Sequence, residues 1–214
     1  MIFDQYKAVL IAVPRTGTHC IFDILHDIAP GSKGIDEGVY RDKPPHLIPY
    51  YKHGHFTYRD WKGFLLGGQT TQAARRNYIT YKIFSFVRNP YDRMASIFYH
   101  YKDHCDSKQT FTEFCHQNLT DEGFWNSWKT QTDFLQGLGG EINLDFIGKL
   151  ENFESDWSQL QLQFGFPPYD PKYRESNKSK RKTIDNFEEL YDEETKSSVF
   201  EHFKDDFVNF DYAQ

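Results

Sequence analysis

An arginine among small and polar residues interrupts the apolar N-terminal part of the chain. The segment Val13–Thr18 reads VPRTGT; it follows the apolar run Ala8–Val13, and apolar residues return after it at helical spacing. A tight loop between a strand and a helix directs unpaired backbone N–H groups and the positive end of the helix dipole at one point. Arg15 adds a permanent positive charge that can bind phosphate or sulfate. The loop therefore predicts an anion site, although a purely structural strand-to-helix connection would look similar.

The neighbours of Arg15 suit the same purpose. Thr16 and Thr18 supply hydroxyl groups, and Gly17 permits a positive φ angle or the close approach of a ligand. The Walker pattern G-x-x-x-x-G-K-[ST] is absent, because Gly17 is the only glycine in the segment. A nucleotide kinase or another P-loop NTPase is therefore an alternative that only the shared α/β architecture supports.

A second candidate segment reads FVRNPYDRMAS and ends at Ser96. Arg88 stands at the end of an apolar run, and open α/β sheets bind their ligands at the carboxyl ends of strands. Ser96 falls two turns into the helix that follows, so a guanidinium and a hydroxyl could face one phosphate group. The structural alternative is that Arg88 binds backbone carbonyls, Arg93 pairs with a nearby aspartate and Ser96 only fills space.

The elements that would position these residues alternate along the chain. Apolar runs predict strands at Ala8–Val13, Ile79–Val87 and Ile142–Leu150. This alternation with helices predicts a single α/β domain over residues 1–214, with a central, mostly parallel sheet of four or five strands flanked by helices. Helical spacing or capping residues predict the helices around Ile21–Ile28, from Pro90 after the cap Asn89, from the capping box Thr110–Glu113, over Phe153–Phe164 and over Asp192–Phe207.

Composition limits the classes of function. The chain has 214 residues and a net charge of −6, so no broad basic surface for nucleic acid or an anionic membrane is expected, and any anion must be bound locally. Three cysteines without a CxxC pair favour a reducing compartment. The first apolar run is too short for a signal peptide or a membrane span, so the protein is expected to be soluble and cytoplasmic. Two long segments without periodicity, Gly31–Gln69 and Pro167–Lys182, are expected to be irregular.

Both candidate segments resemble those of a known enzyme family. Val13–Thr18 is similar to the 5′-phosphosulfate loop of sulfotransferases that use PAPS (3′-phosphoadenosine 5′-phosphosulfate), which usually reads P-K-x-G-[ST]-[ST] or P-R-S-G-[ST]-[ST]. Val87–Ser96 resembles the 3′-phosphate signature V-R-N-P-x-D-R-x-x-S of the carbohydrate (Golgi-type) branch. The segment YKHGHFTYRDW and the portion from QTDFL to the last helix also resemble that branch, in the family's order. Two departures are Arg15, where lysine is common, and His19, where Ser or Thr is customary.

The resemblance implies a P-loop-like three-layer fold. It also implies transfer of a sulfuryl group from PAPS to a hydroxyl of a carbohydrate or another small acceptor, with PAP as product and no metal ion. Arg88 and Ser96 would hold the 3′-phosphate, and Arg15 would also take part in catalysis. The basic run SNKSKRK, with Lys180 and Arg181, would close over the nucleotide unless it is a solvated surface. The residues implied around the phosphosulfate are Arg15, Thr16, Gly17, Thr18, His19 and Cys20.

An acceptor hydroxyl has to lose its proton, and histidine is the commonest general base. The resemblance favours His55, in the pair Gly54–His55, over His53 and His19. The alternatives are that His55 only forms hydrogen bonds within a loop, and that His19 is a surface residue of the first helical turn. A noncatalytic module that binds PAPS or another nucleotide is the alternative for the chain as a whole.

Overall fold

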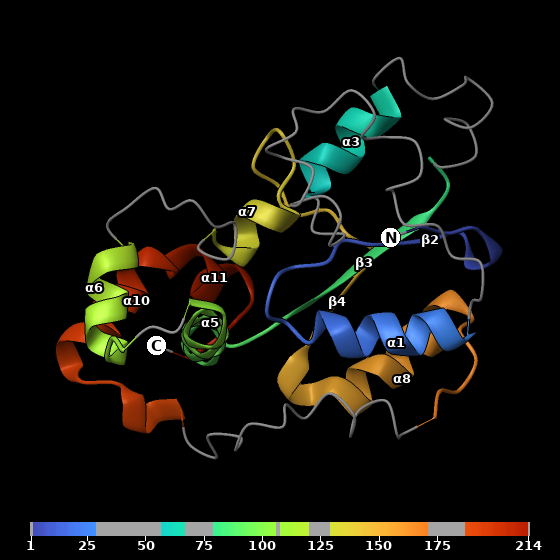
Figure 1. Cartoon of the computed structure of the whole chain (residues 1–214). Helices are drawn as coiled ribbons and strands as arrows, with labels where there is room; N and C mark the ends of the chain where they lie inside the picture. The colour runs from blue at the N-terminus through green and yellow to red at the C-terminus, as the bar shows by residue number, and fades with distance from the viewer. Residues whose placement is uncertain are drawn as a thin grey trace.

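The computed structural model describes residues 2–28, 57–66, 79–105, 108–119, 129–170 and 187–213 (Figure 1). Its central sheet contains the strands β1 (Ile2–Phe3), β2 (Ala8–Leu10), β3 (Lys82–Val87) and β4 (Phe146–Lys149), in that spatial order. β1 pairs antiparallel with β2, whereas the pairs β2–β3 and β3–β4 are parallel. The prediction of a mostly parallel sheet flanked by helices is confirmed.

The parallel register brings three distant chain segments to one edge of the sheet. Val9 lies beside Ile83, and Phe84 lies beside Phe146, so β2, β3 and β4 run in the same direction. The ladder continues one residue beyond β2, where the Ile11 N–H donates to the Phe84 carbonyl at 3.0 Å. The segments that leave this carboxyl edge begin at Pro14, Arg88 and Leu150.

The helices begin where the sequence carries capping residues. Asn89 Oδ1 accepts from the Tyr91 N–H at 2.9 Å, and Pro90 takes the first helical position, as predicted. Thr110 and Glu113 form the predicted capping box, with hydrogen bonds of 2.8 and 3.3 Å. The helices are α1 (Thr18–Ile28), α3 (Tyr58–Leu66), α5 (Pro90–Cys105), α6 (Phe111–Leu119), α7 (Gln131–Leu135), α8 (Phe153–Phe164), α10 (Glu193–His202) and α11 (Lys204–Asn209), with short 3-10 turns η1 (Asp4–Tyr6), η4 (Leu150–Asn152) and η5 (Phe187–Leu190).

The sheet carries helices on both faces, which makes three layers (Figure 1). Phe84 and Phe86 of β3 pack in one buried cluster with the apolar sides of α1 and α8. The alternate residues Ile83 and Val87 pack in a second cluster with α3 and α7. Every second side chain of β3 therefore faces a different helical layer, which is why the strand is apolar on both sides.

A third apolar cluster lies beside the sheet, where α5, α6 and α10 pack together (Figure 1). Met94 and Phe98 of α5 contribute to it, together with Phe114 of α6, Val199 of α10 and Phe207 of α11. The sequence contains 20 Phe and 14 Tyr residues, and the aromatic side chains of this cluster are among those buried in the core. Because α5 packs in this cluster, the cluster also holds in place the part of the segment Val87–Ser96 that lies in α5.

The C-terminal helix differs from its predicted form. The sequence pattern predicts one helix over Asp192–Phe207, but the structure has α10 and α11 with a break at Phe203. At the break the Phe203 ring packs against the Arg93 guanidinium, with 5.6 Å from its central carbon to the ring centre. The break also allows Asp206 to accept hydrogen bonds from the start of α7. Contacts with distant elements therefore interrupt a periodic segment.

Two further predictions about elements were wrong. α3 lies inside the segment Gly31–Gln69 that the sequence pattern presents as irregular, and it starts with a capping box between Thr57 and Asp60, at 2.9 and 3.1 Å. β3 starts at Lys82 rather than Ile79, because Ile79 lies in a turn and is 74% exposed. Among the described helices, none combines the length and the apolarity that a membrane span requires.

Candidate active site

The loop after β2 is held by its own side chains. Thr16 Oγ1 and Thr18 Oγ1 donate to the Val13 carbonyl at 3.0 and 2.7 Å, and both threonines are buried. Arg15 and Gly17 adopt positive φ angles of 68° and 77°. Because each hydroxyl has a single proton, both threonines are engaged in fixing the turn, and donation to an anion would require either of them to release the Val13 carbonyl.

The first turn of α1 presents backbone N–H groups beside this loop. The first hydrogen bond along the helix joins the Ile21 N–H to the Gly17 carbonyl at 3.1 Å. The N–H groups of the turn before Ile21 have no acceptor within the helix, and the helix dipole is positive there. A Cβ atom at Gly17 would lie 2.6 Å from Leu150 Cδ1, so the loop is packed closely against the residue that follows β4.

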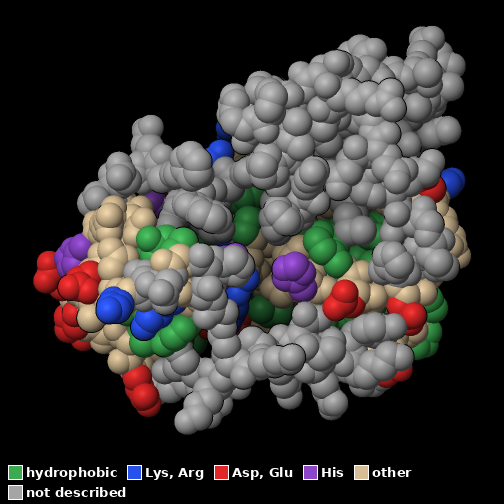
Figure 2. All heavy atoms as spheres, viewed as in Figure 1, with side chains coloured by type: hydrophobic (Ala, Val, Ile, Leu, Met, Phe, Trp, Pro, Cys, Tyr) green, Lys and Arg blue, Asp and Glu red, His purple; other side chains and the backbone are tan. Residues whose placement is uncertain are grey.

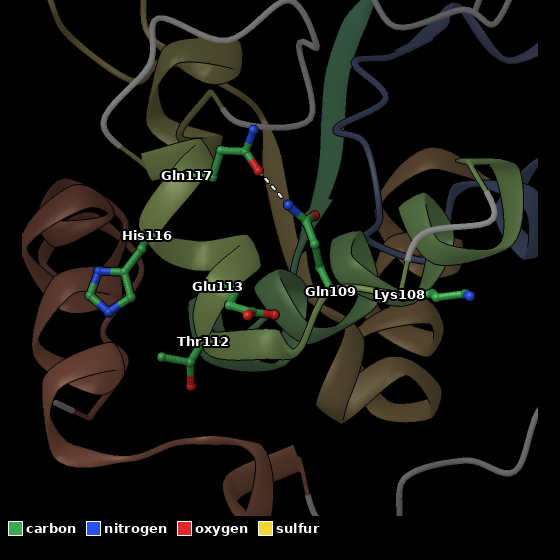
Figure 3. Close-up of a pocket in the computed structure, with 6 residues that line it drawn as sticks. All are labelled: Lys108, Gln109, Thr112, Glu113, His116 and Gln117. Carbon is green, nitrogen blue, oxygen red and sulfur yellow. Dashed lines mark hydrogen bonds between the residues drawn. The ribbon is translucent and has the colours of Figure 1, made fainter.

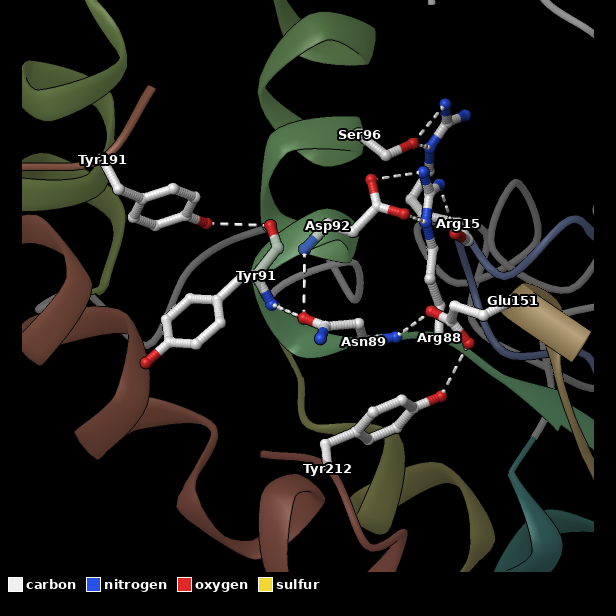
Figure 4. A network of polar contacts seen from close by, with 9 residues as sticks. All are labelled: Arg15, Arg88, Asn89, Tyr91, Asp92, Ser96, Glu151, Tyr191 and Tyr212. Carbon is white, nitrogen blue, oxygen red and sulfur yellow. Dashed lines mark hydrogen bonds and ion pairs between the residues drawn. The ribbon is translucent and has the colours of Figure 1, made fainter. Parts of the chain in front are cut away.

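Arg15 joins the loop to the second predicted segment (Figure 4). Its Nε and Nη2 atoms donate to Ser96 Oγ of α5 at 3.1 and 3.0 Å. Arg88 Nη1 donates to the Arg15 carbonyl at 3.3 Å. The structure thus brings together Arg15, Arg88 and Ser96, although Arg15 and Ser96 are far apart in the sequence.

The Arg88 side chain is oriented by Asp92, which lies in the first turn of α5. Arg88 Nε and Nη2 donate to the two carboxylate oxygens of Asp92 at 2.7 and 2.6 Å, and the two side chains are 22% and 26% exposed (Figure 4). A bidentate pair of this kind fixes the plane of the guanidinium. The backbone of Arg88 is also held, because its N–H and carbonyl both bond to the Gln131 side-chain amide at 2.8 Å.

Arg93 lies behind these residues and is completely buried. It donates from Nε to the Pro14 carbonyl at 3.1 Å and from Nη1 to the Lys129 carbonyl at 3.0 Å. Burial lowers the pKa of Arg93 to about 10, the charge of Asp206 opposes this shift, and the nearby guanidinium groups of Arg15 and Arg88 lower the pKa further. Arg93 is therefore still charged at neutral pH, and Arg15 and Arg88 both lie close enough to affect it.

A carboxylate at the end of β4 closes the other side of the network. Glu151 accepts from the Asn89 N–H and, through its second oxygen, from the Tyr212 hydroxyl at 3.1 Å (Figure 4). Sequence reasoning missed Glu151, although its place just after the third apolar run could have indicated it. It also missed Gln131 and Asp206, which lie in the portion that resembles the family but carry no signal of their contacts.

The remaining predicted residues have different surroundings or lie outside the described residues. His19 is exposed in the first turn of α1. Cys20 is buried in the cluster between the sheet and α1, so its side chain packs in the core. The predictions for His53, His55, Lys180 and Arg181 fall on residues that the structure does not describe.

A separate shallow depression of about 760 Å³ lies on α6 (Figure 3). Hydrogen bonds from Thr110 lower the pKa of Glu113, so this carboxylate is ionised at the start of the helix. The negative charge and the capped helix N-terminus make the depression unsuitable for a phosphate or sulfate group. Its lining residues are Lys108, Gln109, Thr112, Glu113, His116 and Gln117.

The edge of the sheet has the donors that a nucleotide with two anionic ends requires. The half-buried guanidinium of Arg15 and that of Arg88 lie beside a helix N-terminus, and both donor types bind phosphate and sulfate. Figure 2 shows basic side chains in the region between α5 and α1, whereas acidic side chains lie both where α6 and α10 are and on the side of α1. In the described part of the chain, no group of three His, Cys, Asp or Glu side chains is arranged to hold a metal ion.

Comparison with known proteins adds an independent finding. A family model described as the Sulfotransferase family matches residues 49–213, which is most of the chain. The matched range includes Arg88 and Ser96 and begins after the Pro14–Thr18 loop, so the interpretation of that loop depends on its own sequence and geometry. No curated protein and no solved structure matches the chain significantly.

Proposed function

Because the chain belongs to the sulfotransferase family, and is therefore an enzyme that transfers sulfate from PAPS, we propose that Arg15, Arg88 and Ser96 form its PAPS site. The observation that carries this proposal is the meeting of two segments at the carboxyl edge of the sheet, where Arg15 bonds to Ser96 at 3.0 and 3.1 Å and Arg88 bonds to the Arg15 carbonyl at 3.3 Å. A site for one nucleotide with two anionic ends requires such a meeting.

The two arginines have different tasks in this proposal. Arg15 and the first N–H groups of α1 hold the phosphosulfate, with Thr16, Gly17 and Thr18 shaping the turn. Arg88 and Ser96 hold the 3′-phosphate, with Asp92 setting the plane of the Arg88 guanidinium. The donors are positively charged groups and backbone amides, which agrees with the anionic character of PAPS.

The reaction transfers the sulfuryl group to a hydroxyl of a carbohydrate or another small hydroxylated acceptor. PAPS supplies the activated sulfuryl group: the acceptor oxygen forms a bond to sulfur, and the bond from sulfur to the bridging phosphate oxygen breaks. Arg15 and the N–H groups of α1 stabilise the charge that develops on that bridging oxygen. The chain's contribution is therefore mainly positioning and electrostatic stabilisation.

His55 is the proposed general base that accepts the proton of the acceptor hydroxyl. Support comes from the resemblance of its segment and from the residues just after it. Tyr58 and Trp61 of α3 are buried in the same apolar cluster as Val13 and Val87, the residues that precede Pro14 and Arg88. Tyr58 follows His55 by three positions in the sequence.

Sulfuryl transfer from labelled PAPS to a panel of glycans and small hydroxylated metabolites tests the acceptor proposal. We expect labelled product with at least one acceptor and no requirement for magnesium. Binding of PAP should exceed binding of ATP, with or without magnesium, because Arg88 and Ser96 recognise a 3′-phosphate. Tight magnesium-dependent binding of ATP would instead support a nucleotide kinase, and PAP binding without turnover on any acceptor would support a noncatalytic module.

A further inference from the structure

A buried carboxylate on α11 contacts the start of α7. Asp206 is fully buried, and its two oxygens accept from the N–H groups of Gln131 and Thr132 at 2.8 and 2.7 Å. Burial raises the pKa of Asp206, and the Arg93 charge and these two N–H groups oppose that shift. The carboxylate thus fixes the position of Gln131 through its backbone.

Gln131 transmits this position to Arg88. Its side-chain amide donates to the Arg88 carbonyl and accepts from the Arg88 N–H, each at 2.8 Å. Both Gln131 and the backbone of Arg88 are thereby locked in a double hydrogen bond at the end of β3. The Gln131 side chain is completely buried, so water does not compete for these bonds.

Arg93 provides a second connection, to the first loop. Its guanidinium and the Asp206 carboxylate both contact the segment that leads into α7, and the ring of Phe203, three residues before Asp206, lies 5.6 Å from the guanidinium carbon. The opposite charges of the two buried side chains act on each other across this short segment. Arg93 also donates to the Pro14 carbonyl at 3.1 Å, directly before Arg15. Its other bond, to the Lys129 carbonyl at 3.0 Å, ties it to the segment that leads into α7.

We propose that Asp206 is a positioning residue for both halves of the PAPS site. It acts on Arg88 through Gln131 and on the Pro14–Thr18 loop through Arg93, and it contacts neither phosphate nor sulfate itself. This inference rests on the proposed function, which assigns donor binding to those two segments. Neither sequence segment that resembles the family's phosphate signatures contains Asp206 or Gln131.

The physical reason is the charge of a completely buried arginine. Without the Asp206 carboxylate, Arg93 would keep a buried positive charge next to two further guanidinium groups, and the α7 N–H groups would lose a charged acceptor. The start of α7 and the Pro14–Thr18 loop would move to reduce the cost of this uncompensated charge. A small displacement of a binding group is enough to weaken a preorganised site.

The test compares Asp206→Asn with Val199→Ala. Asparagine has the shape of aspartate without its charge, and Val199 is a buried residue of α10 that belongs to the same C-terminal region. PAP affinity is measured by calorimetry, and amide hydrogen exchange is measured on the peptide that contains Pro14–Thr18. We expect Asp206→Asn to weaken PAP binding about tenfold and to speed exchange in the loop peptide, whereas Val199→Ala lowers Tm and changes neither.

Gln131→Leu tests the connection through Gln131 separately from the connection through Arg93. It also serves as the test if Asp206→Asn does not fold. It removes the bonds to Arg88 and leaves Arg93 and the loop in contact, so PAP binding should weaken about tenfold while exchange in the loop peptide stays as in the wild type. In the double variant, the loss of PAP affinity should be smaller than the product of the single losses, because both act on Arg88.

The outcomes distinguish this inference from the proposed function. Wild-type PAP affinity and wild-type loop exchange in Asp206→Asn, with only a lower Tm, would show that Asp206 stabilises the fold and positions nothing. Wild-type PAP affinity in Gln131→Leu would overturn the connection to Arg88. A wild-type chain that binds no PAP would contradict the proposed function, while loop exchange in Asp206→Asn would still decide whether Asp206 positions the loop.

Discussion

At the scale of single residues, Arg15 and Arg88 illustrate how one residue type can serve two purposes. The Arg15 side chain reaches a hydroxyl on another element, and its own backbone is in the left-handed region. Arg88 is held at its backbone by Gln131 and at its guanidinium by Asp92. The Arg88 guanidinium is therefore preorganised to bind an anion at one position, whereas Arg15 lies where the two segments meet.

Replacing Arg88 should affect affinity. In the proposed site, Arg88→Ala removes charge-assisted hydrogen bonds to the 3′-phosphate, so the free energy of PAP binding should become less favourable by about 1.5–3 kcal/mol. Arg15→Ala should lower turnover more than PAP affinity, because the proposed function assigns Arg15 to the group being transferred. Arg59→Ala is the matched control for the loss of one positive charge, since Arg59 bonds to the Gly137 carbonyl outside the site. Equal losses of affinity and turnover in both site variants would contradict the division of tasks.

A base at His55 predicts a change in the pH profile. His55→Asn should keep PAP affinity and lower kcat by roughly 10²–10⁴, the usual contribution of general-base catalysis. Wild-type activity should fall as pH decreases through the ordinary histidine pKa of about 6.5, since a protonated imidazole cannot accept a proton, and the variant should lack this decrease.

His53→Asn and His19→Asn are the controls for the base, and His116→Asn on α6 tests a histidine remote from the proposed site. If His55→Asn kept nearly full turnover and His19→Asn abolished it, the proton acceptor would lie in the first turn of α1.

At the scale of elements, local signals in the sequence were sufficient to predict the starts of α5 and α6. Asn89 and Pro90 mark the start of α5, and the Thr110 capping box marks α6. The same kind of box starts α3 at Thr57 and α7 at Thr130, but neither helix has the long apolar periodicity that makes such a box predictive, so a local cause alone is not sufficient.

The contacts that the sequence could not indicate join residues that lie far apart in the chain. Asp206 meets Gln131 across 75 positions, and no residue near either one reports the contact. The break at Phe203 also coincides with long-range contacts, because the Phe203 ring packs on Arg93 and the Asp206 side chain binds the start of α7. The two segments that meet at the edge of the sheet could be identified, since strand ends and an arginine are visible in the sequence; the residues that hold them in place could not.

Gly17 and Gly165 have similar backbone conformations but different surroundings, so alanine variants at the two positions distinguish effects on stability from effects on PAP binding. Gly17 and Gly165 have φ angles of 77° and 71°, but an added Cβ at Gly165 meets nothing within 4 Å, whereas at Gly17 it meets Leu150 at 2.6 Å. Gly165→Ala should lower the free energy of unfolding by about 1–2 kcal/mol and leave PAP affinity unchanged. Gly17→Ala should lower both, because the positive φ angle strains alanine and the added Cβ forces the Leu150 side chain or the loop itself to shift. Urea denaturation and PAP titration of the two variants check this, and unchanged PAP binding in Gly17→Ala would argue against a donor site at the loop.

At the scale of the whole molecule, buried acidic groups predict sensitivity to alkali. Burial raises the pKa of the Cys115 thiol to about 12, and burial also raises the pKa values of Tyr191 and Tyr212. Above pH 9 the unfolded chain releases the Cys115 proton and the folded chain retains it, so the corresponding stability is present below pH 9 and is lost as pH rises toward 12.

Urea denaturation between pH 8 and pH 11 measures this loss. The free energy of unfolding should decrease with pH less steeply in Cys115→Ala than in the wild type, and Cys105→Ala should retain the wild-type slope because Cys105 is exposed. At pH 8, a thiol reagent should modify Cys105 well before Cys115. Identical slopes in all three proteins, or equally fast modification of both thiols, would contradict the effect of burial.

The parallel register of the sheet has a consequence for how the chain acquires activity. Ala8 pairs with Lys82, and Phe84 pairs with Phe146, so each contact has to close a long loop before it is stabilised. Chains dominated by such pairings fold slowly, over milliseconds to seconds. The Arg15–Ser96 contact joins the segments that follow β2 and β3, 81 positions apart, and ribosomal synthesis has to reach α11 before Asp206 can bind Gln131. PAP should therefore bind no folding intermediate, and by selecting the finished chain it should slow unfolding and protect newly made enzyme from proteolysis.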